Sequence, residues 1–377
     1  MLNRVPAEIF PPGEFIREEL EARGWTQDDL AQIMGRPVRL VNELVNAKKQ
    51  ITPDTARGLA EAFGTDPLYW MNLDSAYRLS ATSQADDTVS LRAQLYDKFP
   101  VREILKRHWV EGSKNLDVLR ERLLRFHELT SMDQQPQFAH AAKANQYEER
   151  TPLQWAWLYR AKQLSEAVRV GQYEKRKLIN AVSELAKLRM AAEEIRQIPS
   201  ILASAGVRFV IVEYLPGAKI DGASFWLNEK SPVIALSLRF DRIDNFWFVL
   251  RHEIEHILNG DGFSMDIELT EKIESNAELP PQEVKANDAA ADFCVSMYEM
   301  QNFIARLRPL YSEQRILLFA RRIGVHPGLV VGQLQRRKEV PYTHFHKFLV
   351  KVRDIITRTT LTDGWGSVPP IPSNGGE

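Results

Sequence analysis

The chain has 377 residues, of which 49 are Lys or Arg and 50 are Asp or Glu, and its 44% hydrophobic content suits about two or three domains. This composition excludes fibrous, disulfide-stapled and wholly disordered proteins, and a formal net charge of −1 gives no overall attraction to nucleic acid. The first residues do not have the basic and then apolar pattern of a secretory signal peptide. No apolar run reaches the roughly 18 residues that a membrane-spanning helix needs. We therefore expect a cytoplasmic protein without membrane contact.

Residues 10–80 are predicted to form five short helices, each starting at a capping residue and stopping at Gly or before Pro. One helix begins after Thr26 and ends at Gly35, and Pro37 opens the next, which carries an apolar stripe. Two short helices joined this tightly indicate a helix-turn-helix, whose second helix enters the major groove of double-stranded DNA.

The second helix and its flanks supply polar side chains that suit DNA. Arg39 and Asn42 can read guanine and adenine edges. Residues 1–80 carry nine basic and twelve acidic side chains, but residues 36–49 carry four basic ones and a single Glu, so a local basic face remains. A helix-turn-helix used only for protein contact is the alternative. The predicted DNA-contacting residues are Gln27, Arg36, Arg39, Asn42, Lys48 and Lys49.

Beyond residue 80 the apolar period is lost, and residues 81–90 are predicted to be a linker or a helix extension. Residues 91–200 have a helical pattern and are predicted to form a connector whose role the sequence does not reveal. The pattern then changes to three β-branched and aromatic runs, which predict a small sheet. We expect the run at 233–238 to be an edge strand that could pair with an extended peptide, and residues 363–377 to form a flexible tail.

The segment His252-Glu253-Ile254-Glu255-His256 lies within an apolar helix expected from about Arg242 to Asn259. A separation of four residues places both imidazoles on one helix face, where they can share a metal ion. Glu253 is offset by about 100° and is placed to act as a general base toward a water. Zinc suits this arrangement because it accepts neutral imidazole and needs only three protein ligands at a catalytic site. The alternative is that both are ordinary core histidines, but their burial would leave hydrogen bonds unmade.

A third ligand has to come from elsewhere, since Gly262 stands where a metzincin would have its third His. Glu283 begins a helix that is rich in alanine, and these small side chains would let it approach the helix that carries the histidines closely. Glu283 is the predicted third ligand. Asn287, one turn further on, is predicted to orient a ligand imidazole through its non-coordinating nitrogen. His326 is either a catalytic residue that stabilises developing charge or a residue that supports a turn. Cys294 is expected to be a core thiol.

Both ends of the chain carry segments with a recognisable likeness. Residues 10–80 contain Thr26-Gln27-Asp28-Asp29-Leu30-Ala31, Gly35-Arg36-Pro37-Val38 and Trp70-Met71-Asn72-Leu73, and resemble the HigA-type antitoxin branch of the Cro/C1 (XRE) helix-turn-helix family. Residues 201–345 contain the His252–His256 motif, Glu283-Val284-Lys285-Ala286-Asn287 and Gly324-Val325-His326-Pro327-Gly328, and resemble the ImmA/IrrE metallopeptidase family. Two positions depart from these families: Asn287 stands where the second often has Asp, and Ala47 stands where the first often has Gly.

The resemblance implies a mostly helical α+β protein with a Cro/C1-like domain at 10–80, a helical connector at 91–200 and a zincin-like domain at 201–345. Its leading functional implication is a DNA-binding regulator with a zinc endopeptidase domain that cleaves a repressor or another regulatory protein. The alternative is a DNA-binding antitoxin and autorepressor, paired with a cognate toxin, whose metal site is a sensor or inactive. Readers of operator DNA often dimerise, so a homodimer is an expected assembly.

Overall fold

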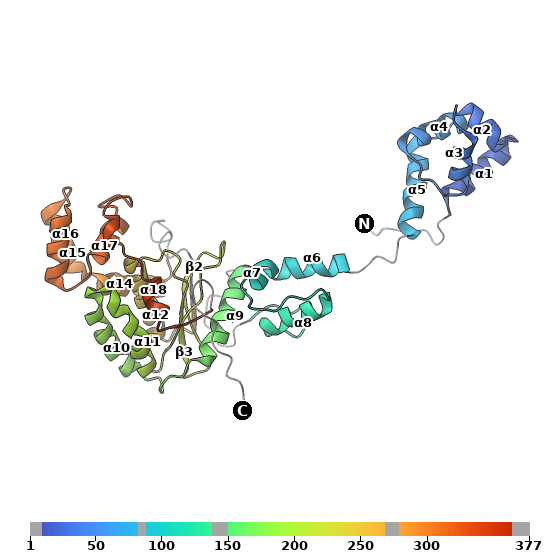
Figure 1. Ribbon diagram of the computed structural model, residues 1–377. Helices are drawn as coiled ribbons and strands as arrows, with labels where there is room; N and C mark the ends of the chain where they lie inside the picture. The colour runs from blue at the N-terminus through green and yellow to red at the C-terminus, as the bar shows by residue number, and fades with distance from the viewer. Residues whose placement is uncertain (1–9, 82–87, 138–149, 268–278, 364–377) are drawn as a thin grey trace. The chain divides into compact units, whose positions relative to one another are not determined.

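The computed structural model describes residues 10–81, 88–137, 150–267 and 279–363 (Figure 1). The chain divides into two compact units, residues 1–90 and 91–377. Across the described ranges, no helix combines the length and apolar character needed to cross a membrane.

The first unit is a bundle of five helices, as the sequence predicts. Two of its helices begin with capping boxes, in which Thr26 and Thr52 accept from the backbone three residues on. The core contains fully buried Ile16, Leu30 and Trp70. The helices are α1 (Pro12–Arg23), α2 (Gln27–Ile33), α3 (Val38–Val45), α4 (Pro53–Phe63) and α5 (Pro67–Ala81).

The second unit is built around a five-stranded mixed sheet with the order β4-β2-β3-β1-β5. Strand β1 runs parallel to β3 and β5, whereas β2 runs antiparallel to β3 and β4. The strands are β1 (Arg208–Ile211), β2 (Ile220–Trp226), β3 (Pro232–Leu236), β4 (Phe263–Ile267) and β5 (Leu361–Thr362).

Helices precede, interrupt and follow the strands of this unit. Before β1 lie α6 (Thr88–Lys98), α7 (Val101–Lys106), α8 (Leu116–Phe126), α9 (Pro152–Ala167), α10 (Lys175–Lys187), the 3-10 turns η2 (Leu188–Met190) and η3 (Ala192–Gln197), and α11 (Ile198–Ser204). After β3 lie α12 (Ile243–Asn259), α14 (Pro281–Cys294), α15 (Met297–Leu307), α16 (Glu313–Ile323), α17 (Pro327–Arg336), η4 (His346–Phe348) and α18 (Arg353–Ile356).

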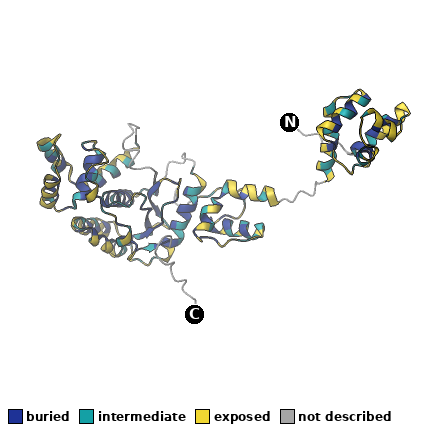
Figure 2. Cartoon of the chain, turned by 45° about the horizontal axis from the view of Figure 1, so that its top comes forward, coloured by how far each residue is buried: buried dark blue, intermediate teal, exposed yellow. Residues whose placement is uncertain are grey.

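Helices cover both faces of the sheet, and this is why the strands read as continuous apolar runs. Alternate residues of a strand enter different cores: Ile211 belongs to the core that contains Trp247 of α12, whereas Val210 belongs to the core that contains Trp157 of α9. Figure 2 shows the same division, with buried residues in the sheet and in the helices against it and exposed residues along α6. The overall class is mostly helical α+β with a small mixed sheet.

Three expectations about this unit are corrected by the structure. Residues 233–238 do not form an edge strand, because β3 pairs with β2 on one side and β1 on the other. Among the described strands, β4 and β5 stand at the two edges, and the sequence predicted neither of them. Residues 91–200 are not a separate connector, since the side chains of α8 and α9 share one core with the sheet.

The third correction concerns the end of the unit. The fold continues past residue 345 as far as Asp363, because β5 pairs with β1 and the Asp363 carboxylate accepts a hydrogen bond from buried Arg107 at 3.3 Å. The rest of the predicted tail, 364–377, lies outside the described residues.

Candidate metal centre and nucleic-acid interface

Helices α12 and α14 bring the three predicted metal ligands together. The apolar side chains of α12 pack against the sheet and fix the helix there, with His252 and His256 facing α14. Glu283, in the first turn of α14, approaches both imidazoles. One ligand atom from each of His252, His256 and Glu283 can be chosen so that all three lie within 4.8 Å of one another.

The spacing of these atoms fits a zinc ion. The two Nε2 atoms are 2.9 Å apart, His252 Nε2 lies 3.3 Å from a carboxylate oxygen of Glu283, and His256 Nε2 lies 3.6 Å from the other. Two ligand atoms held about 2.1 Å from a tetrahedral zinc ion lie about 3.4 Å apart. The imidazoles would therefore have to separate by only about 0.5 Å to accept the ion.

Asp261 determines which nitrogen of the His256 imidazole carries the proton. Its carboxylate lies 2.9 Å from Nδ1 of His256, which donates to it and so leaves a lone pair on Nε2. That lone pair points at His252 Nε2 and at the Glu283 carboxylate, so acceptors converge on one point. Converging acceptors require a cation or a shared proton between them.

A residue outside the predicted set orients the imidazole of His256. Asp261 holds Nδ1 of His256, and the buried Asn287 Oδ1 accepts no hydrogen bond from any described residue. The predicted role of Asn287 beside a ligand imidazole stays a prediction for His252. Asp261 follows Gly260, which ends α12 in the left-handed conformation at φ 77°. This turn brings the chain back beside His256, a closure that helical periodicity does not reveal.

Glu253 is fully buried and its carboxylate reaches the sheet. A Cβ atom at Gly222 of β2 would lie 2.7 Å from Glu253 Oε1 and 2.7 Å from Val249 Cγ1. Only glycine therefore leaves room for the carboxylate at this point of the strand. The sequence analysis missed Gly222, whose lack of a side chain makes the space for this carboxylate.

A charged network beside the cluster ties the two helices together. Glu255 accepts from Arg251 at 2.7 Å and lies 3.6 Å from Nζ of Lys285, two residues after the third ligand. Lys285 also donates to Asn259 at the end of α12. These contacts join α14 to the end of α12.

His326 occupies the N-cap of α17, where its Nδ1 accepts from the backbone N–H of Gly328 at 3.1 Å. Burial lowers the pKa of His326, which keeps Nδ1 unprotonated and able to accept. Of the two roles considered for His326, this geometry favours support of a turn over catalysis. Cys294 is buried, and burial raises the pKa of its thiol to about 12, as suits a core residue.

In the first unit, α2 and α3 form the predicted helix-turn-helix, with Gly35 at φ 61° in the turn. Val41, Leu44 and Val45 bury one face of α3, and the opposite face exposes Arg39 and Asn42. Of the other predicted contact residues, Arg36, Lys48 and Lys49 are exposed and Gln27 is half-buried.

Several of these side chains hold one another in place. Asn42 donates to Gln27 at 3.1 Å, which joins the two helices, and Arg39 pairs with Glu43 at 2.9 Å. Arg36 pairs with Asp54 of α4, so part of its charge is already neutralised. Arg39 nevertheless keeps 88% of its side chain exposed, and it is the basic group best presented to a base edge.

The comparisons with known proteins concern this first unit. Residues 16–70 match the helix-turn-helix family. Virulence-associated protein I of Dichelobacter nodosus is 34% identical over 90 residues, which is 24% of this chain and 82% of that protein. An uncharacterized HTH-type transcriptional regulator of Haemophilus influenzae is 36% identical over 76 residues, 20% of this chain and 68% of its own.

This chain belongs to the helix-turn-helix family. Its XRE-type domain is that of a DNA-binding transcriptional regulator or antitoxin-like protein. Among solved structures, an addiction module antidote protein of a HigA family from Coxiella burnetii is 31% identical, covers 23% of this chain and 94% of that one, and gives a TM-score of 0.21.

One feature of the helix-turn-helix domain is unusual. Ala47, just after α3, takes φ 53°, a left-handed conformation that costs an alanine about 1 kcal/mol relative to glycine. The backbone N–H groups of Ala47 and Lys48 donate to carbonyls of α3 at 3.0 and 2.9 Å, so the turn is fully bonded despite that cost. Lys48 and Lys49 are thereby held directly beyond α3, the helix predicted to enter the major groove.

Proposed function

We propose that this helix-turn-helix regulator carries a zinc-dependent endopeptidase in its second unit, which cleaves a repressor or another regulatory protein. The observation that carries the proposal is the convergence of His252, His256 and Glu283, with Glu253 next to His252 in the sequence of α12. The resemblance of this region to the ImmA/IrrE metallopeptidases, and hence to a zincin-like fold, supports it.

Each residue has a defined task in this proposal. His252, His256 and Glu283 would hold zinc, and Asp261 would orient His256. Zinc supplies Lewis acidity, which polarises a carbonyl and makes a water more acidic. Glu253 would take the proton of the attacking water and pass it to the leaving nitrogen.

The strand on which a peptide substrate would bind is β4, and not β3 as the sequence predicted. Strand β4 is at the edge of the sheet and also contacts α12, the helix that bears the histidines. An extended peptide would add to this edge by backbone pairing, which would align its carbonyl groups along the strand.

A second candidate function keeps DNA binding and makes the metal site a sensor or an inactive remnant, in an antitoxin and autorepressor paired with a toxin. Burial of the cluster favours it: His252, Glu253 and His256 are at most 1% exposed, and the Glu283 side chain is 26% exposed. A closed site suits a metal that is held rather than one that receives a protein substrate.

Zinc content tests the metal site itself. We expect the purified full-length protein to contain about one zinc per chain by mass spectrometry of the metal, because the cluster offers three ligands to one ion. Removal of zinc by a chelator should lower the melting temperature, and added zinc should restore it. Protein that contains no zinc and takes none up would contradict the endopeptidase and the metal sensor, and would leave only the inactive remnant.

Arg39→Ala tests base readout by the helix-turn-helix. An operator selected from random DNA should lose preference at one base pair, worth about 1–3 kcal/mol, because Arg39 is the exposed reader on α3. Lys49→Ala is the matched control, and it should weaken all sequences equally and reduce the salt dependence of binding. Equal behaviour of the two variants would show that Arg39 does not read bases.

A further inference from the structure

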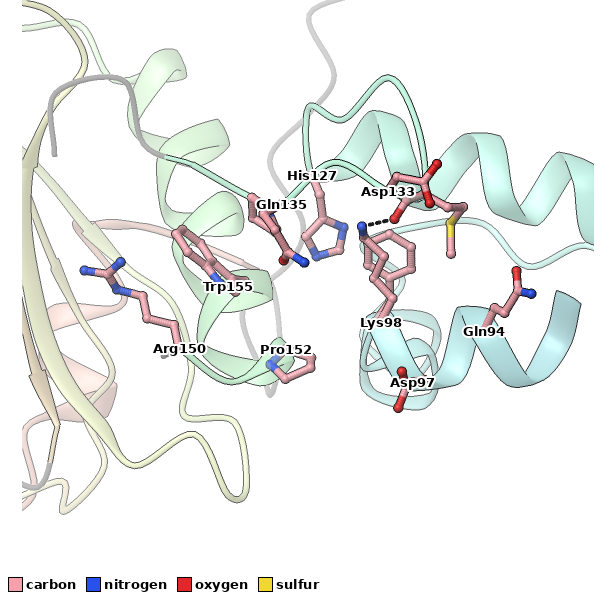
Figure 3. Close-up of a pocket in the computed structure, with 12 residues that line it drawn as sticks. Gln94, Asp97, Lys98, His127, Asp133, Gln135, Arg150, Pro152 and Trp155 are labelled. Carbon is pink, nitrogen blue, oxygen red and sulfur yellow. Dashed lines mark hydrogen bonds between the residues drawn. The ribbon is translucent and has the colours of Figure 1, made fainter. Parts of the chain in front are cut away.

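A cavity lies in the part of this unit that precedes the sheet. It has a volume of about 490 Å³ and is lined by residues of α6 and α9, by Phe99 and Arg150 beside these helices, and by the segment after α8, none of them from α12 or α14 (Figure 3). A cavity of this size accommodates a small organic molecule. Neither DNA binding by the helix-turn-helix nor the chemistry proposed for the metal cluster uses this cavity.

His127 gives this cavity an unsatisfied hydrogen-bonding atom. The residue is only 1% exposed, and its Nδ1 lies 2.9 Å from the carbonyl oxygen of Leu123, to which it donates. Nε2 therefore carries the lone pair, and it is buried without a partner among the described residues. Burial lowers the pKa of His127 to about 4, so the ring is neutral near pH 7 and Nε2 is an acceptor.

A buried acceptor without a donor costs about 1–3 kcal/mol, and such atoms in native proteins call for an explanation. Figure 3 shows the imidazole of His127 between the side chains of Gln135 and Lys98, within the ring of residues that line the cavity. A ligand that donates to Nε2 from inside the cavity would supply the missing bond.

Flat apolar surfaces line the same space. Phe99 stacks on the imidazole with ring centres 4.7 Å apart, and Trp155 and two prolines, Pro136 and Pro152, complete the apolar lining. Trp155 is held by the guanidinium of Arg150, 5.1 Å from its ring. Such surfaces favour a planar ring over a flexible chain.

The charges of the lining cancel, which selects against strongly charged ligands. Two acidic residues, Asp97 and Asp133, stand against two basic ones, Lys98 and Arg150. Lys98 donates to the carbonyls of Met132 and Gln134, so its ammonium is partly satisfied and has one N–H left for a ligand acceptor. The lining therefore offers an acceptor, a donor and aromatic faces with no net charge.

We propose that this cavity binds a neutral planar nitrogen heterocycle, whose ring N–H donates to His127 Nε2 and whose carbonyl accepts from Lys98. The ring would stack on Trp155. The site is independent of the metal cluster and provides the regulator with a small-molecule input.

The test uses two matched pairs, one of ligands and one of proteins. Uracil and hypoxanthine are the probes, and 1,3-dimethyluracil is the matched control because it keeps the ring and carbonyls of uracil but has no N–H. Binding to the full-length protein is measured by calorimetry, and quenching of Trp155 fluorescence, absent in Trp155→Phe, reports the location. We expect at least one probe to bind and dimethyluracil to bind at least tenfold more weakly than uracil.

His127→Phe keeps a planar ring but removes the acceptor. It should weaken the N–H probes at least tenfold and leave dimethyluracil unchanged, whereas Gln94→Ala at the cavity wall should retain binding of the probes. If His127→Phe does not fold, as judged by circular dichroism, His127→Gln keeps an acceptor and should still prefer uracil over dimethyluracil. Absence of binding by both probes at millimolar concentration, equal binding of uracil and dimethyluracil, or wild-type affinity in His127→Phe would overturn the proposal.

Discussion

Glu253→Gln is expected to abolish proteolysis by the second unit while zinc remains bound. The amide keeps the shape of the side chain in its space beside Gly222 but cannot take a proton from water. Loss of a general base lowers the rate by about 10²–10⁴-fold. Cleavage is measured across all cellular proteins, by sequencing the new protein N-termini that arise in cells expressing the wild type and are missing with the variant.

Glu255→Gln is the matched control for this experiment. It makes the same chemical change two residues further along α12, on a carboxylate that pairs with Arg251 and Lys285 instead of facing the sheet. Cleavage should persist in Glu255→Gln. Identical sets of N-termini from wild type and Glu253→Gln would exclude the peptidase and leave the sensor or inactive site as the function.

Gly222→Ala should disturb the same carboxylate, that of Glu253, from the strand that packs against it. The added methyl group would meet Glu253 Oε1 at 2.7 Å and Leu236 Cδ2 at 3.0 Å, so the carboxylate has to move. Overpacking of this kind costs about 1–3 kcal/mol of stability. We expect cleavage to fall as in Glu253→Gln while the zinc content stays that of the wild type.

The second large effect is expected at the metal ligands. His256→Ala should reduce zinc affinity by well over 100-fold, because it removes one of three converging ligands and leaves the Asp261 carboxylate without its partner. Asp261→Ala should reduce affinity about 10–100-fold, the usual effect of losing the group that orients a ligand imidazole. Affinity is measured by competition with a zinc-binding dye.

His326→Ala separates the two roles considered for that residue. As a helix cap it should lose about 1 kcal/mol of stability and keep the zinc affinity and the cleavage of the wild type. If His326→Ala instead folds as stably as the wild type but cleaves poorly, the residue belongs to the catalytic site. If Asp261→Ala binds zinc as tightly as the wild type, the orienting role of Asp261 is wrong.

Local sequence determined the helix-turn-helix and the face of α12 that carries His252 and His256. Capping residues, helix-ending glycines and the four-residue spacing of His252 and His256 act within one or two helical turns, so they can be recognised without a tertiary structure. The same local rules located the first turn of α14, and with it Glu283.

The positions that complete the site were decided by the tertiary structure. Asp261 reaches His256 only because Gly260 turns the chain back, and Gly222 meets Glu253 only because β2 packs against α12. The order of the strands, which places β3 inside and β4 at the edge, depends on pairing between segments far apart in the chain. Neither hydrophobic periodicity nor residue spacing records such pairings, since both describe only the near neighbours of a residue.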